Sequence, residues 1–177
     1  MKIAVYCSAR NQVGEEYKAL ARDLGRWIAE NGHTLVFGGA TGGLMTEVSK
    51  AAFEAKGEVV GVIPERIEKA GRISPYCTEL VRCYVMSERK QQMRDNADVL
   101  VCLPGSYGTL DEMFDVIASG TVGEHHKPIY ILNYKGFYEG LLQQIKTMKA
   151  LSFLPQEESY KPCFVDSLQE LQTIINQ

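Results

Sequence analysis

Three turns of this chain carry the residue types that bind phosphate groups and other anions. Two are rich in glycine, residues 38–45 (GGATGGLM) and residues 104–112 (PGSYGTLDE), and the third is basic, residues 86–93 (MSERKQQM). Glycine lets the backbone turn tightly and approach a ligand, and a helix that follows offers free amide N–H groups to an anion. The sequence therefore indicates an anion-binding site built from several turns.

The first glycine turn contains Gly38, Gly39, Gly42 and Gly43. Its order does not match the G-x-G-x-x-G pattern of dinucleotide-binding proteins, and no lysine follows it as in a Walker A loop. A tight strand-to-helix turn with close packing explains the same glycines without a ligand. Taken by itself, this turn leaves both interpretations open.

The second glycine turn adds the hydroxyl groups of Ser106 and Thr109, which can hydrogen-bond phosphate oxygens. The positive end of a following helix contributes about 0.3–1 kcal/mol to the binding of a nearby anion. Thr109 and Glu112 also have the spacing of a capping box, in which the glutamate reaches back to the amide at the helix start. Spacing alone favours this structural role for Glu112.

The basic turn places Arg89 and Lys90 in the first turn of a helix that Ser87 is expected to cap. Cations are disfavoured at the positive end of a helix, so helix stability does not explain them. An anionic ligand or a buried carboxylate would explain them. The alternative is a solvated turn in which Glu88 neutralises part of the charge.

The elements that must position these turns alternate between short apolar strands and amphipathic helices. We expect strands at residues 2–7, 34–37, 58–63, 80–85, 99–103 and 128–132, and helices at residues 17–28, 45–55, 112–118, 137–148 and 167–175. This alternation predicts an α/β fold, a Rossmann-like doubly wound parallel sheet with helices on both faces. Ligands bind such sheets at the carboxyl ends of the strands, so the three turns should converge there. We expect one domain over residues 1–177, with residues 64–75 forming a loop and short helix beside the site.

Composition excludes several classes of function. Nineteen Lys and Arg residues against 22 Asp and Glu residues give a net charge of −3, which argues against general binding to nucleic acid or an anionic membrane. The chain has no apolar run of about 18 residues, as a membrane span requires. Its five cysteines form no C-x-x-C pair, and its N-terminus leads directly into a strand, so we expect a cytoplasmic protein. Adjacent His125 and His126 face apart on a helix, and we expect no metal site.

As a set, the three turns resemble the Lonely Guy (LOG) family of cytokinin-activating enzymes, also labelled lysine decarboxylase-like. The likeness extends to Val62-Ile63-Pro64, Lys127-Pro128 and residues 132–138. It implies a phosphoribohydrolase, which cleaves the N-glycosidic bond of a cytokinin riboside 5′-monophosphate or a related purine nucleotide such as AMP. The products would be the free base and ribose 5-phosphate. It implies no cofactor, and a homodimer of Rossmann-like subunits.

The resemblance also assigns roles to residues. It makes Arg89 and Glu112 the catalytic pair. We interpret Asp115, three residues after Glu112, as an ordinary helix-face residue. The residues expected to bind the substrate and its phosphate are Gly38, Gly39, Gly42, Gly43, Met86, Lys90, Gly105, Ser106, Tyr107, Gly108 and Thr109.

The chain also departs from the family pattern. Ser106 replaces a glycine, Thr46 follows Met45 where another glycine is common, and residues 7–10 (CSAR) stand where a C-G-S turn is typical. Residues 118–122 replace a T-W-x-Q stretch, which bears on base preference.

The same residues leave three alternative functions open. The main alternative is a non-catalytic nucleotide-binding sensor or interaction module on the same fold. An NAD-dependent oxidoreductase is weaker because no G-x-G-x-x-G turn follows the first strand. A pyridoxal-phosphate lysine decarboxylase is weakest, because no lysine has a defined Schiff-base context.

Overall fold

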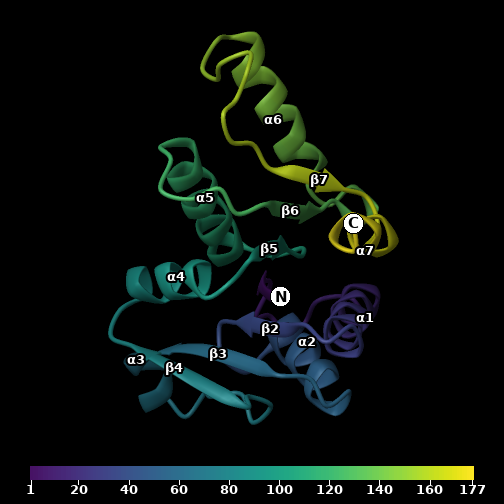
Figure 1. The fold of residues 1–177 in the computed structure, drawn as a ribbon, viewed down its shortest axis with the longest axis vertical. Helices are drawn as coiled ribbons and strands as arrows, with labels where there is room; N and C mark the ends of the chain where they lie inside the picture. The colour runs from purple at the N-terminus through teal and green to yellow at the C-terminus, as the bar shows by residue number, and fades with distance from the viewer.

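The structure is a computed structural model that describes residues 1–177, and it contains one seven-stranded sheet with parallel pairing throughout (Figure 1). The strand order is β4-β3-β2-β1-β5-β6-β7. The strands are β1 (Lys2–Tyr6), β2 (Thr34–Phe37), β3 (Val59–Pro64), β4 (Glu79–Cys83), β5 (Val99–Cys102), β6 (Ile129–Leu132) and β7 (Cys163–Val165). The helices are α1 (Glu15–Glu30), α2 (Gly43–Glu54), α3 (Glu65–Lys69), α4 (Met86–Asp95), α5 (Tyr107–Thr121), α6 (Glu139–Ala150) and α7 (Leu168–Ile175), with a 3₁₀ turn at Tyr134–Gly136.

Two apolar cores lie on opposite faces of the sheet, which confirms the doubly wound α/β prediction. Successive residues of β1 alternate between them: Ile3 and Val5 belong to one core, and Ala4 and Tyr6 to the other. The first core includes buried side chains of α1, α2 and α7, and the second includes those of α4 and α5. The strands therefore need apolar residues on both faces, as their sequences indicate.

Some boundaries differ from the prediction. Strand β4 is an edge strand with Glu79 and Arg82 exposed, so it is not a buried strand. Helix α4 starts at Met86 with Val85 at its N-cap, so Ser87 does not cap it; the carboxylate of Glu88 instead accepts the Tyr84 amide at 2.8 Å. Residues 163–165, which lie outside the expected strands, form the seventh strand.

The strand order reverses at β1, which lies between β2 and β5. In open α/β sheets the ligand site lies beyond the carboxyl ends of the strands at such a switch point. Here the segment after β1 and the turns after β2 and β5 end at that position. No helix has both the length and the apolar character that crossing a membrane requires.

Candidate active site

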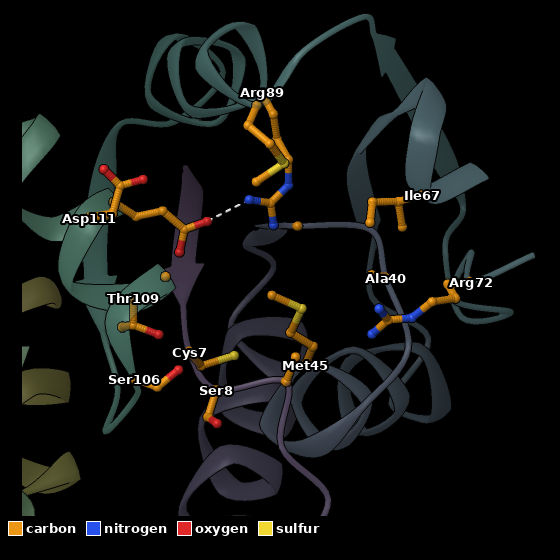
Figure 2. A pocket seen from close by; sticks show the side chains of 15 residues that line it. Cys7, Ser8, Ala40, Met45, Ile67, Arg72, Arg89, Ser106, Thr109 and Asp111 are labelled. Carbon is orange, nitrogen blue, oxygen red and sulfur yellow. Dashed lines mark hydrogen bonds and ion pairs between the residues drawn. The ribbon is translucent and has the colours of Figure 1, made fainter. Parts of the chain in front are cut away.

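A cleft of about 230 Å³ lies at this switch point (Figure 2). It collects residues from the ends of β1, β2 and β5, from α4 and α5, and from the segment that contains α3. Its lining residues are Cys7, Ser8, Ala9, Gly38, Ala40, Met45, Ile67, Arg72, Met86, Arg89, Ser106, Gly108, Thr109, Asp111 and Glu112. Residues from all three turns therefore meet in one concave site.

Arg89 of α4 and Glu112 of α5 form a buried ion pair in the cleft, drawn as a dashed line in Figure 2. Arg89 Nη1 donates to Glu112 Oε1 at 2.6 Å, and Arg89 Nε donates to the Val62 carbonyl at 3.3 Å. Only 5% of Arg89 and 6% of Glu112 are exposed. Two charged side chains can remain buried away from water when they pair with each other. Removing one of them leaves a buried charge without a partner, which is strongly destabilising.

Burial raises the pKa of the Glu112 carboxyl, while the Arg89 charge and its hydrogen bond act in the opposite direction. The net effect is a raised pKa, because desolvation is the largest of these influences. The second carboxylate oxygen, Oε2, accepts no hydrogen bond from the protein. Glu112 therefore keeps one oxygen for a ligand and titrates nearer to neutral pH than an exposed glutamate.

Gly38 makes room for the arginine. A Cβ atom at residue 38 would lie 1.6 Å from Arg89 Nη2, so any side chain there would displace the guanidinium. The structure thus gives the first glycine turn a role that its sequence pattern did not indicate. The absence of a side chain at Gly38 allows Arg89 to reach Glu112.

The other glycines of that turn serve packing. Gly42 and Gly43 have φ of +125° and +47°, and a Cβ on either would lie 2.5 Å from a backbone oxygen of residues 9–10. The amide of Gly42 donates to Thr46 Oγ1 at 2.8 Å, and that of Gly43 to Asn11 Oδ1 at 2.7 Å. These amides are already occupied, and Gly39, Gly42 and Gly43 lie outside the cleft lining.

The start of α5 presents unoccupied amides instead. The backbone N–H groups of residues 106–109 donate no hydrogen bond within the protein. Ser106, Gly108 and Thr109 line the cleft, whereas Gly105 lies just outside its lining and Tyr107 is 90% exposed. A Cβ at Gly105 would lie 2.1 Å from Thr109 Oγ1, so this glycine allows the threonine to pack against the turn. Free amides at the positive end of a helix form an anion site.

Helix α5 begins at Tyr107, five residues before Glu112, so Glu112 does not form the capping box that its spacing suggested. Its carboxylate meets Arg89 instead. A buried carboxylate therefore explains why Arg89 stands at the start of α4, where helix stability disfavours a cation. Arg89 faces a buried carboxylate and not solvent.

Lys90, predicted to bind substrate, lies outside the cleft lining. Its Nζ contacts Asp111 Oδ1 at 3.0 Å and Asp115 Oδ1 at 3.1 Å, which joins α4 to α5. Met86 does line the cleft. Of these two neighbouring cations, Arg89 faces the cleft, whereas Lys90 links α4 to α5 outside its lining.

Sequence reasoning missed several lining residues, above all Arg72. This arginine extends into the cleft from the wall opposite Thr109 and Ser106 (Figure 2), and its Nη2 donates to the Thr41 carbonyl at 3.4 Å. It forms no ion pair with a carboxylate of this chain. The sequence signal for Arg72 was its position in residues 64–75, the loop and short helix expected beside the site. No role was assigned to that segment.

Residues 118–122, where the chain departs from the LOG pattern, do not line the cleft. Ser119 instead accepts from Arg94 Nη1 at 2.8 Å, and His125 Nε2 lies 3.2 Å from the same hydroxyl and 3.0 Å from the Val116 carbonyl. Within one subunit this stretch contacts α4 and the segment that precedes β6.

The sequence model of the family described as "possible lysine decarboxylase" matches residues 45–175. The cytokinin riboside 5′-monophosphate phosphoribohydrolase of Mycobacterium tuberculosis (strain ATCC 25618 / H37Rv) is 34% identical over 168 residues, covering 95% of this chain and 89% of that protein. The chain belongs to the LOG family. Its relative LOG5 of Arabidopsis thaliana, which has the same enzyme name, is 37% identical over 141 residues, covering 80% of this chain and 62% of that protein.

The chain spans about three fifths of the length of some plant LOG proteins: the match covers 61% of probable LOG4 of Oryza sativa subsp. japonica and 62% of Arabidopsis LOG5. Solved structures agree on the fold. TM1055, a structural-genomics target, has a TM-score of 0.75 at 26% identity, covering 99% of this chain and 98% of that one. The molybdenum cofactor carrier protein of Chlamydomonas reinhardtii has a TM-score of 0.76 at 21% identity, covering 99% of this chain and 96% of that one, and shows the fold alone.

Proposed function

We propose that this LOG-family chain hydrolyses the N-glycosidic bond of a purine nucleoside 5′-monophosphate, either a cytokinin riboside 5′-monophosphate or AMP, and releases the base and ribose 5-phosphate. The buried Arg89–Glu112 pair at the switch-point cleft is the observation that carries this proposal. The names of the LOG relatives support the same reaction class.

The unoccupied amides of residues 106–109 support a place for the 5′-phosphate, together with the hydroxyls of Ser106 and Thr109. A nucleotide with its phosphate there carries its ribose toward Glu112, which lies farther along the same helix. The base then extends toward the wall formed by Ala40, Ile67 and Arg72.

Cleavage of an N-glycoside passes through an oxocarbenium-like state, with positive charge at the anomeric carbon and negative charge on the leaving base. The ionised Glu112 carboxylate stabilises the cationic sugar, and its free oxygen accepts a proton from the water that bonds to the anomeric carbon. That proton then neutralises the base, which leaves with the electron pair of the N-glycosidic bond. Arg89 holds the other carboxylate oxygen and offsets negative charge on the nucleotide. No step of this mechanism requires a cofactor or metal ion.

The test is a panel of AMP, other nucleoside monophosphates and isopentenyl-adenosine monophosphate, with the free base quantified by chromatography. Base release from at least one of them supports the proposal. If none releases base while a nucleotide still binds by calorimetry, the chain is the nucleotide-binding module that is the main alternative.

We propose a homodimer as the working form. Helix α6 buries none of its residues and lies at one end of the long axis of the molecule (Figure 1). An apolar groove beside it is lined by Tyr107, Leu110, Phe114, Phe137 and Leu141. A second copy of the chain would cover this surface. The five free cysteines fit the reducing cytoplasm as the proposed location.

A further inference from the structure

Helices α4 and α5 each contribute one member of the proposed catalytic pair, and polar contacts dominate the approach between them. The buried residues of α4 are only Arg89 and Met93. Met93 is the one apolar side chain of α4 that is buried, and α4 also lies against β3 and β4. The contacts that join α4 to α5 therefore add to this packing on the sheet in setting the position of Arg89 relative to Glu112.

Asp115 is at the centre of those contacts. Its Oδ2 lies 3.3 Å from Arg94 Nη1, and its Oδ1 lies 3.1 Å from Lys90 Nζ. Arg94 Nη1 also donates to Ser119 Oγ at 2.8 Å, one turn farther along α5. Each oxygen of one carboxylate thus meets a cation from a different turn of α4.

These contacts are better shielded than ordinary surface ion pairs. The Arg94 side chain is 13% exposed and that of Asp115 is 31% exposed. Asp115 is three residues after Glu112 on α5, and Arg94 is five residues after Arg89 on α4, so the contact lies about one turn farther along both helices than the proposed catalytic pair. Partial burial and a shared carboxylate strengthen a network beyond isolated exposed pairs.

We propose that Arg94 and Asp115 are positioning residues, which hold α4 and α5 in the register at which Arg89 meets Glu112. This inference rests on the proposed hydrolase function. It assigns a role to Asp115, which the sequence suggested was an ordinary helix-face residue. It also gives the altered stretch 118–122 a role in this chain, since Ser119 extends the contact.

The experiment compares the wild type with Arg94→Ala, Arg94→Lys and Asp115→Asn, using release of the base from AMP or, where AMP is not cleaved, from isopentenyl-adenosine monophosphate. Arg26→Ala is the matched control, because Arg26 forms an exposed pair with Asp23 on α1 at 3.2 Å. We expect kcat to fall about tenfold for Arg94→Ala and Asp115→Asn, since small displacements of catalytic groups lower rates steeply. KM should change little, Arg94→Lys should recover most of kcat, and the control should match the wild type.

A second readout separates positioning from stability. A displaced Arg89 lowers the pKa of the Glu112 carboxyl less, so that pKa rises in Arg94→Ala, as measured by carbon-13 NMR of the carboxyl. The other charged or titratable groups around Arg94 are Asp95, Glu124, His125 and Lys127, and the Ala and Lys variants share them. Arg94→Lys should return the pKa to the wild-type value.

An unchanged kcat in folded Arg94→Ala would overturn the inference, as would a lower melting temperature with the Glu112 pKa unmoved. Failure of the proposed function gives a different pattern, in which the wild type itself releases no base. The NMR readout then still reports whether Arg94 sets the environment of Glu112.

Discussion

The carboxyl of Glu112 is buried among charged neighbours of both signs, and these set the pH at which it ionises. Desolvation raises its pKa above the ordinary value of 4.5, Arg89 and Lys90 lower it, and Asp111 raises it. Catalysis by the ionised form is absent well below that pKa and present above it. We therefore predict that kcat/KM rises with pH through an apparent pKa above 4.5.

Two substitutions should shift this rise of kcat/KM with pH, the acid limb of the pH profile, in opposite directions. Lys90→Met removes a charge that lowers the pKa of Glu112, so the limb should move to higher pH; Asp111→Asn removes one that raises it, so the limb should move to lower pH. Kinetics with AMP over a pH series, in a buffer of constant ionic strength, measure both. Shifts of the same sign in the two variants would contradict this electrostatic assignment.

Arg72 also lines the cleft, and its guanidinium has no carboxylate partner. We predict that Arg72→Ala raises KM for AMP by roughly threefold to tenfold, the value of one or two hydrogen bonds, with a smaller effect on kcat. Arg66→Ala is the control, because Arg66 lies on the neighbouring helix α3 outside the cleft lining. Equal changes in the two variants would show that only net charge matters.

At the scale of elements, substitutions at two glycines of the turn after β2 should have different effects. One should remove activity, and the other should lower stability. Gly38→Ala places a Cβ where the Arg89 guanidinium lies and should abolish base release through displacement of that group. Gly42→Ala strains a residue at φ +125° against the Ala9 carbonyl and should destabilise the fold by roughly 1–3 kcal/mol. Urea unfolding and AMP kinetics distinguish the two effects.

Gly32→Ala, in the turn after α1, supplies the control, since nothing lies within 4 Å of the added Cβ and Gly32 lines neither the cleft nor the groove beside α6. It should leave activity unchanged and destabilise the chain by about 1–2 kcal/mol, because Gly32 has a φ of +70°. A loss of activity in this variant, or full activity in Gly38→Ala, would contradict the assignment of Gly38.

The elements also show what sequence could and could not predict. Strands β1, β2, β5 and β6 were placed within one residue at each end, because continuous apolar runs have few other stable arrangements. The start of α5 was misplaced, since the capping spacing of Thr109 and Glu112 is a local signal that tertiary contacts override. The Arg89–Glu112 contact joins residues 23 apart, and only the packing of α4 against the sheet and α5 determines it. The family resemblance indicated the pair but not its burial or the support from Lys90, Arg94 and Asp115.

At the scale of the whole molecule, the exposed apolar groove between α5 and α6 predicts self-association. Phe114 is 42% exposed within that groove. We expect light scattering after gel filtration to give twice the subunit mass for the wild type and the subunit mass for Phe114→Asp, because a buried charge at an apolar interface is strongly unfavourable. Lys56→Asp, at a loop away from the groove, is the control. A wild-type monomer, or a dimer that Phe114→Asp leaves intact, would show that this surface does not mediate pairing.

The most direct measurement of the central claim is single-turnover hydrolysis of AMP by the wild type and by Glu112→Gln, which keeps the size of the side chain and removes its charge. The wild type should release adenine and ribose 5-phosphate in equal amounts, and the variant should be slower by roughly 10²- to 10⁴-fold. Circular dichroism should show the same fold, and calorimetry should still detect AMP binding to the variant. Equal rates of base release from the two proteins, or no release by the wild type from either AMP or isopentenyl-adenosine monophosphate, would contradict the account.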